Sequence, residues 1–296
     1  MRSLLVCLLA LCVIAAPAAP LPQPPAKPNV IVVLCDDYGY NDVGAYTFPS
    51  PADYYPNSGP APNFPETDPD IPPPNQARTL TPRLDAMAGQ GLRFTSFYSC
   101  ARNCTPARAS LMTGCYANRV SMPAVINPTS NRGLNTTEIT LPEVLKTAGY
   151  ATGMVGKWHL GYAPDQARST QFLPTRQGFD EYLGLPYSND MFQRELFLIE
   201  DETPIESMGT SQSNTGVHQN KLIWRYTERA LDFIDRNQAG PFFLYLAHSM
   251  PHIPVFPSQS TFTNADGTTW PMFQGASGIS WYYDIVMEID HSMGRI

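Results

Sequence analysis

Short apolar segments typical of buried β-strands alternate with helical segments along this chain. The segment NVIVVL at 29–34 is rich in β-branched residues, and FFLYLA at 242–247 is equally apolar. Such alternation predicts an α/β fold, with a doubly wound, mostly parallel (mixed) sheet flanked by helices. Further strands are predicted at 150–155 and 179–183, and helices between Thr81 and Gly91, between Thr105 and Gly114, and over Thr140–Ala148, Gln219–Asn237 and Asp284–Ile296.

Composition narrows the class of protein further. The 30 prolines among 296 residues exclude a long single helix, a coiled coil or a helical repeat array. Ten of them fall within residues 48–76, which we expect to form an irregular loop inserted in the domain. The formal net charge of −7, from 19 basic and 26 acidic residues, argues against nucleic acid as a partner.

The N-terminus has the pattern of a secretory signal peptide, predicted at residues 1–18. Arg2 provides the positive charge, Leu4–Ala16 is an unbroken apolar run, and Ala16-Pro17-Ala18 matches a small-residue cleavage site. A membrane anchor would need roughly 20 apolar residues, so we expect no membrane span once the signal is removed. A Pro/Ala-rich leader at 19–28 follows, and we expect the product to be secreted or lysosomal.

Four cysteines remain after removal of the signal. Cys35 ends an apolar run and is expected in the core, whereas Cys104 lies in a motif where chemistry is expected. Cys100 and Cys115 are therefore the one plausible disulfide pair in an oxidising compartment. Asn135-Thr136-Thr137 is a sequon for N-glycosylation, which would make the product a glycoprotein.

Polar residues follow several predicted strands, at the carboxyl edge where doubly wound sheets bind ligands. Asp36 and Asp37 come directly after the first strand, and two adjacent carboxylates favour a compensating cation such as Ca²⁺ or Mg²⁺. Lys157 and His159 follow the second strand in GKWHLG and would suit an anion, and His252 lies between prolines after FFLYLA. Each feature alone is weak evidence for a site. The two aspartates could form an exposed turn, a Gly-Lys pair at a strand end is not specific, and a lone histidine is often structural.

The segment Cys104-Thr105-Pro106-Ala107-Arg108 is the most informative. A helix predicted to begin at Pro106 would point its free N–H groups and positive dipole end at Cys104. Arg108, one turn into that helix, offers a planar donor fork suited to a tetrahedral oxyanion. A buried cysteine beside a capped helix is the alternative that spacing alone leaves open.

CTPAR followed by ASLMTG resembles the signature of type I sulfatases, in which the motif cysteine is oxidised to formylglycine. Five further segments resemble blocks of this family in the same order: VVLCDDYGYNDVG, TPRLDAMAGQGLRF, TGMVGKWHLGY, GFDEYLGLPYSND and PFFLYLAHSMPHIP. GLPYSND is most similar to the arylsulfatase A-like branch. The resemblance implies an alkaline-phosphatase/sulfatase-like fold, with residues 29–296 as the N-terminal catalytic domain, and hydrolysis of a sulfate monoester on an aryl sulfate or a sulfated carbohydrate.

By this resemblance, Asp36, Asp37 and the converted Cys104 would hold a divalent cation, usually Ca²⁺ in the family. A formylglycine-generating enzyme would be a partner. The conversion makes chemical sense. A thiol that attacked the sulfate ester would form a covalent adduct that does not readily release sulfate. A hydrated aldehyde can attack with one hydroxyl, and deprotonation of its other hydroxyl then expels sulfate. Arg108 would hold the hydrate and offset its charge.

The resemblance also implies roles for four residues around the sulfate. Lys157 and His252 would bind sulfate oxygens, with Lys157 on the leaving-group side. Ser188 would help to hold the aldehyde end. His159 would be the base that deprotonates the hydrate, so that the aldehyde is regenerated.

Three further family features, two metal ligands and a second lysine, would follow the helix that begins near Tyr283, and the chain stops before them. We therefore expect a C-terminally truncated catalytic domain with little sulfatase activity by itself. Two alternatives stay open: a phosphonate or phosphate monoester hydrolase of the same superfamily, and an inactive secreted sulfatase-like fragment. Residues 48–76 and 190–218, loops that would shape the pocket for the alcohol, carry no readable specificity.

Overall fold

The computed structural model describes residues 27–46, 80–162, 169–191, 195–209 and 218–296. The main element is a six-stranded sheet in the order β1-β6-β2-β3-β4-β5. Its strands are β1 (Val30–Asp36), β2 (Ala151–Gly156), β3 (Glu181–Gly184), β4 (Leu196–Glu200), β5 (Thr203–Gly209) and β6 (Phe242–Pro251). The predicted signal peptide, the proline-rich loop and most of the leader lie outside the described residues.

The sheet is mixed, as predicted. β1, β6, β2 and β3 are parallel to one another, whereas β3, β4 and β5 pair antiparallel. The prediction of a loop over residues 190–218 is wrong for the β4–β5 hairpin. The sequence hides this hairpin because β5 carries Pro204 and polar residues, a composition that an edge strand tolerates but that gives no strand signal.

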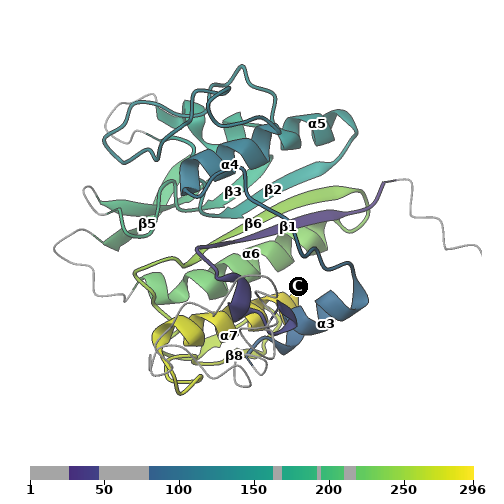
Figure 1. The fold of residues 1–296 in the computed structure, drawn as a ribbon, viewed down its shortest axis with the longest axis vertical. Helices are drawn as coiled ribbons and strands as arrows, with labels where there is room; N and C mark the ends of the chain where they lie inside the picture. The colour runs from purple at the N-terminus through teal and green to yellow at the C-terminus, as the bar shows by residue number, and fades with distance from the viewer. Residues whose placement is uncertain (1–26, 47–79, 163–168, 192–194, 210–217) are drawn as a thin grey trace, which may run out of the picture.

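Helices cover both faces of the sheet (Figure 1). α4 (Cys104–Thr113) and α5 (Leu141–Thr147) lie on one face, and α3 (Pro82–Gln90), α6 (Leu222–Asn237) and α7 (Trp281–Arg295) on the other. The five predicted helices are therefore confirmed, with ends that differ by a few residues. The remaining elements are short: η1 (Tyr40–Asp42), η2 (Gly44–Tyr46), η3 (Ser169–Phe172), η4 (Pro174–Arg176), η5 (Gln219–Lys221), β7 (Phe262–Thr263) and β8 (Thr269–Trp270).

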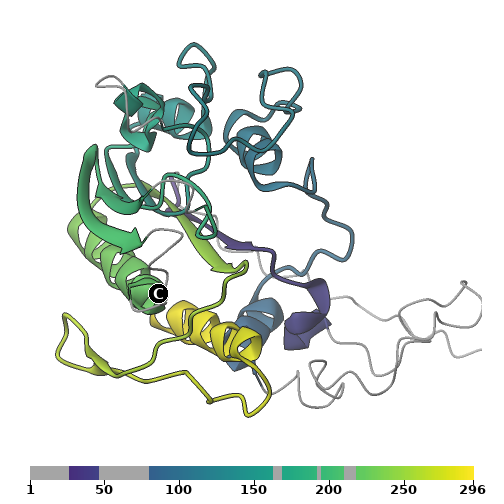
Figure 2. The same ribbon diagram turned by 90° about the vertical axis from the view of Figure 1, so that its left-hand side faces the viewer.

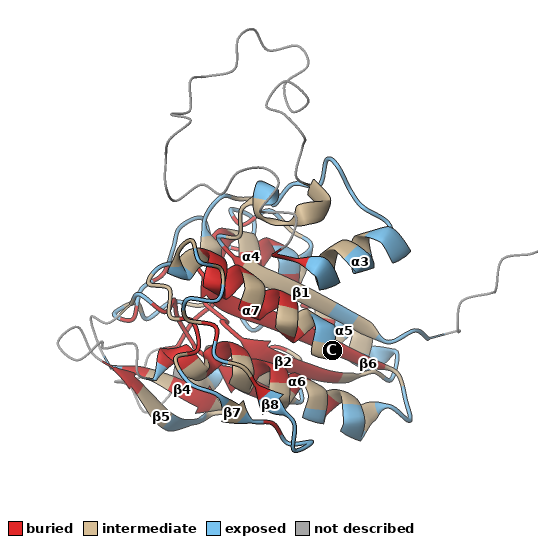
Figure 3. Cartoon of the chain, turned by 90° about the horizontal axis from the view of Figure 1, so that it is seen from below, coloured by how far each residue is buried: buried red, intermediate tan, exposed pale blue. Residues whose placement is uncertain are grey.

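The core centres on β6, which lies between β1 and β2. Every residue of β6 is buried, as the red strand in Figure 3 shows. A parallel strand with helices on both faces has no solvent side, and this explains why FFLYLA is apolar without alternation. The centre of the sheet therefore holds the carboxyl ends of β1, β6 and β2 in fixed register.

The β1 side of the sheet is open by comparison. β1 is an edge strand whose residues are mostly half-buried. The connection from α3 to α4 passes β1 on the side away from β6 (Figure 2), and residues 91–100 are all exposed. Leu92, Phe97 and Tyr98 are at least 80% exposed, so this side carries an apolar surface.

The predicted disulfide is wrong, because Cys100 and Cys115 are both free thiols. They lie before and after the ten-residue helix α4, which is about 15 Å long, whereas bridged Cα atoms lie within roughly 7 Å. Cys35 packs against the core, as predicted. No helix in the described part of the chain is long and apolar enough to cross a membrane.

Candidate active site

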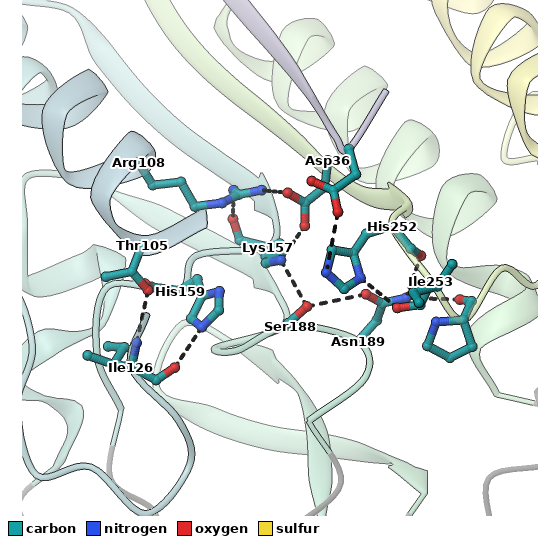
Figure 4. A network of polar contacts seen from close by, with 12 residues as sticks. Asp36, Thr105, Arg108, Ile126, Lys157, His159, Ser188, Asn189, His252 and Ile253 are labelled. Atoms are coloured by element: carbon teal, nitrogen blue, oxygen red, sulfur yellow. Dashed lines mark hydrogen bonds and ion pairs between the residues drawn. The ribbon is translucent and has the colours of Figure 1, made fainter. Parts of the chain in front are cut away.

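Polar side chains from four elements converge at the carboxyl edge of the sheet (Figure 4). β1 supplies Asp36 at its last position, and the loop after β2 supplies Lys157. The loop after β3 supplies Ser188, and α4 supplies Arg108 from its second turn. The parallel register brings these loops together, since Asp36 pairs with Pro251 and Gly156 with Ala247 across β6.

Asp36 is the buried centre of the site. Its carboxylate accepts a hydrogen bond from Lys157 Nζ, and its Oδ1 lies 3.5 Å from Arg108 Nη2. All three side chains are at least 93% buried. Burial alone would raise the pKa of Asp36, but the charges of Arg108 and Lys157 outweigh it and hold the pKa below its ordinary value. Asp36 is therefore ionised and shared between two cations.

Arg108 keeps unused donors in this buried place. Its Nη1 donates to the Lys157 carbonyl oxygen at 2.5 Å and to Tyr245 Oη at 3.3 Å. Within the described part of the chain, Nε is buried without a hydrogen-bond partner, and Nη2 forms only the 3.5 Å ion pair with Asp36 Oδ1. Unsatisfied buried donors are costly unless a ligand meets them, so the guanidinium fits an oxyanion bound at the site.

Cys104 begins α4, with Asn103 as its N-cap. The helix therefore starts two residues earlier than predicted from Pro106, and Cys104 lies within its first turn. Burial would raise the pKa of the thiol, but a hydrogen bond with His252 and the charge of Lys157 outweigh it and lower the pKa. The site thus favours a negatively charged group at this position.

Asp36, Cys104 and His252 each have a potential ligand atom within 4.8 Å of the others. This group could hold a cation through the Asp36 carboxylate, with the Cys104 sulfur and a His252 ring nitrogen as the other two candidate ligand atoms. Asp37 lies outside the group: its side chain is 63% exposed, and its Oδ2 is 3.6 Å from His252 Nε2. His252 in turn places Nδ1 2.5 Å from the Ile253 carbonyl oxygen.

The remaining predicted residues line the same edge. Lys157 Nζ donates to Ser188 Oγ at 2.9 Å. His159 is fully buried, and its Nε2 lies 2.8 Å from the Ile126 carbonyl oxygen. A carbonyl only accepts, so Nε2 carries the ring proton, and Nδ1 has an open lone pair with no partner among the described residues. Burial first, and then the Lys157 charge, lower the pKa of His159 to about 3, so the ring is neutral.

Two residues that hold this site were not predicted to do so. Tyr245 meets Arg108 from the middle of β6, where the apolar run hides a single hydroxyl. Asn189 follows Ser188 and contacts the segment of His252. GLPYSND contains Asn189, but nothing in a lone asparagine indicates which distant backbone it will bind.

Fold and site together define an α/β protein with a buried cationic site and a cysteine at a helix N-terminus. The chain belongs to the sulfatase family, whose model matches residues 28–296. It is 34% identical to bovine (Bos taurus) arylsulfatase A over 287 residues, covering 92% of this chain and 48% of that protein. It is 35% identical to N-acetylgalactosamine-6-sulfatase of Canis lupus familiaris over 303 residues, covering 94% and 47%.

Solved structures agree on the fold. A Bacteroides thetaiotaomicron sulfatase, solved in work on glycosaminoglycan metabolism, superposes with a TM-score of 0.67 at 23% identity, covering 91% of this chain and 58% of that one. The PsFucS1 sulfatase of Pseudoalteromonas sp. superposes with a TM-score of 0.62 at 24% identity, covering 90% and 50%. The chain spans about half the length of the curated relatives it matches.

Proposed function

We propose that this chain provides the nucleophile and sulfate-binding side of a sulfate monoester hydrolase. One observation carries the proposal: Cys104 stands at the start of α4 beside His252, with the buried cations Arg108 and Lys157 next to it. Two fixed cations and a helix N-terminus suit a sulfate group, whose charge grows on the leaving oxygen during cleavage. The substrate would be an aryl sulfate or a sulfated glycan.

The cofactors of this reaction would be built on the same residues. Cys104 would be converted by a formylglycine-generating enzyme; the hydrate then supplies a hydroxyl nucleophile, and Ca²⁺ or Mg²⁺ held with Asp36 and Asp37 supplies positive charge. Arg108 would orient the modified side chain with its Nε donor, which has no partner in the described part of the chain, and with Nη2, which also forms the ion pair with Asp36. The low pKa of Asp36 supports this assignment, since a cation ligand has to be ionised.

Side chains of this chain would bind the sulfate group and transfer protons. Lys157 and His252 would donate to sulfate oxygens, and Ser188, which accepts from Lys157 Nζ, would keep that lysine aimed at the site. His159 would accept a proton at Nδ1, because Nε2 is committed to the Ile126 carbonyl. A neutral imidazole with an open lone pair has the form that a base requires. Burial and the Lys157 charge lower its pKa, so the role also requires the negative charge of a bound anion, which would raise the pKa.

The product would travel the secretory pathway as a glycoprotein, secreted or lysosomal, after removal of residues 1–18. Asn135 is exposed, and its Oδ1 accepts the Thr137 N–H at 3.1 Å. The exposed turn leaves room for a glycan at this sequon. Residues 29–296 would form the N-terminal catalytic domain.

Binding of inorganic sulfate tests the proposal without requiring turnover. Calorimetry on the chain with added Ca²⁺ would compare Lys157→Met with Lys146→Met, an exposed lysine paired with Asp180. We expect Lys157→Met to weaken sulfate binding at least about tenfold, since a buried charge-assisted contact is lost, and Lys146→Met to leave it unchanged. No sulfate binding by the wild-type chain, or equal losses, would contradict the proposal.

Turnover then separates the rival chemistries. Faster hydrolysis of 4-nitrocatechol sulfate than of 4-nitrophenyl phosphate would support a sulfatase, and the reverse order would support the phosphate or phosphonate monoester hydrolase. Sulfate binding without turnover and with an unmodified Cys104 thiol would support the non-catalytic, sulfatase-like fragment.

A further inference from the structure

We infer that Asn189 is a positioning residue that fixes His252 against the anion site. The inference rests on the proposed function in one respect, that His252 contacts the bound sulfate. Asn189 is fully buried, and its Nδ2 donates to the carbonyl oxygens of His252 at 3.1 Å and Pro254 at 3.0 Å (Figure 4). Both amide hydrogens are therefore spent on one short segment of backbone.

The His252 ring contacts Asp37 and the Ile253 carbonyl oxygen, but both of these partners are exposed or belong to the same segment. β6 ends at Pro251, and Pro251 and Pro254 have no N–H to donate. The ladder to β1 ends where Pro251 pairs with Asp36, and outside that ladder the described part of the chain shows no backbone–backbone hydrogen bond to residues 253 and 254. Asn189 therefore supplies the side-chain hydrogen bonds that hold the backbone of this segment from the β3 side.

Asn189 is itself fixed from the other side. Its backbone carbonyl oxygen accepts a hydrogen bond from Nε2 of the fully buried Gln219 at 3.0 Å. This contact connects Asn189 to the start of η5, which leads into α6. Its neighbour Ser188 accepts from Lys157 Nζ at 2.9 Å. Two adjacent residues thus set the two groups proposed to bind sulfate: Ser188 aims Lys157, and Asn189 aims His252.

The chemistry of the contact predicts which substitution breaks it. An aspartate has the same size as asparagine but only accepts hydrogen bonds when ionised. In Asn189→Asp the carboxylate would face two carbonyl oxygens, and the His252 segment would be pushed away rather than held. Asn189→Ala removes both donors without adding charge, and serves if the aspartate variant folds poorly.

Gln177→Glu is a matched control. Gln177 is also fully buried, and its Nε2 donates to a backbone carbonyl, that of Leu134, at 2.9 Å. The same amide-to-acid change is therefore made at a second buried site, whose amide contact is outside the anion site. A general cost of burying a carboxylate would appear in both variants.

Two measurements on the full chain test the inference: calorimetric affinity for inorganic sulfate, and the ring NMR resonances of His252, assigned among the five histidines by His252→Gln. We expect Asn189→Asp and Asn189→Ala to weaken sulfate binding roughly tenfold, the effect of about one lost hydrogen bond, and to shift the His252 resonances. Gln177→Glu should do neither, at a comparable loss of melting temperature.

The outcomes separate this inference from the proposed function. If the wild-type chain binds no sulfate but Asn189→Ala still moves the His252 resonances, the sulfate role fails and the positioning role stands. If sulfate binds and the Asn189 variants leave both its affinity and the His252 resonances as in the wild type, the positioning role is overturned.

Discussion

Asp36 and Asp37 are adjacent in sequence, yet they face two regions of opposite character. Asp36 belongs to the closed side of the site, formed with Arg108, Lys157 and Ser188, all of which are at most 1% exposed. Asp37 faces solvent, as do the segment at residues 91–100 and part of the β1 edge. The anion-binding half of the site is thus preorganised by burial and paired charge, whereas on the open side Asp37 is exposed and has only the 3.6 Å contact with His252.

The largest contrast is expected between the two aspartates themselves. Asp36→Asn leaves Arg108 and Lys157 as buried cations without a counter-charge, which costs about 3–5 kcal/mol of the free energy of unfolding. Asp37→Asn changes an exposed residue with a positive φ of 55°, a conformation that asparagine tolerates well, so we expect a change within roughly 0.5 kcal/mol. Urea unfolding in the presence of a chelator measures the free energy of unfolding of both variants. Equal losses would contradict the expected difference between the two aspartates.

Aromatic residues of the two regions provide a second contrast. Phe243 lies in β6 with no exposed surface, and Phe243→Ala should cost roughly 3 kcal/mol, since it leaves a cavity in the core. Phe97 is 80% exposed, and Phe97→Ala should change the free energy of unfolding by less than about 0.5 kcal/mol. A large loss for Phe97→Ala would mean that the open side is covered in solution.

A second buried acid separates the effect of burial from that of paired cations. Glu288 of α7 is fully buried and accepts from Ser258 N and Trp270 Nε1. Burial raises its pKa from 4.5 to about 8, the opposite direction to Asp36. The folded state therefore holds a proton that the unfolded state releases, so this residue's contribution to stability falls as pH rises from 4.5 towards 8.

This linkage has a defined size and a simple control. The slope is at most about 1.4 kcal/mol per pH unit, and Glu288→Gln, which stays neutral, should flatten it. Melting temperatures between pH 5 and 8 (roughly the range over which the group titrates) provide the measurement. The same slope in the wild type and in Glu288→Gln would show that the pH dependence arises elsewhere.

The sequence was sufficient for the elements whose signals are local. The apolar runs of β1 and β6, the capping box of Thr140 and Glu143 at α5, and the amphipathic α6 all have patterns that follow from their immediate surroundings. Order along the chain also places Asp36 and Lys157 at one edge, because parallel strands end on the same side.

What the sequence could not predict depends on contacts between distant segments. The sharing of Asp36 between Arg108 and Lys157 joins residues 121 positions apart in the case of the lysine. The β4–β5 hairpin lacks alternation in β5, and the false Cys100–Cys115 pair came from counting thiols without the length of α4 between them. The role of Asn189 could not be predicted for the same reason, since its partners lie 63 and 65 residues away in the sequence.

The identity of the side chain at position 104 in the mature protein tests the central proposal most directly. Mass spectrometry of the Cys104 peptide, from protein made in cells that contain a formylglycine-generating enzyme, should find a mass about 18 Da below that of the cysteine form, as expected when CH₂SH is replaced by CHO. A fully unmodified thiol in that peptide would contradict the proposal that this site performs sulfate ester hydrolysis.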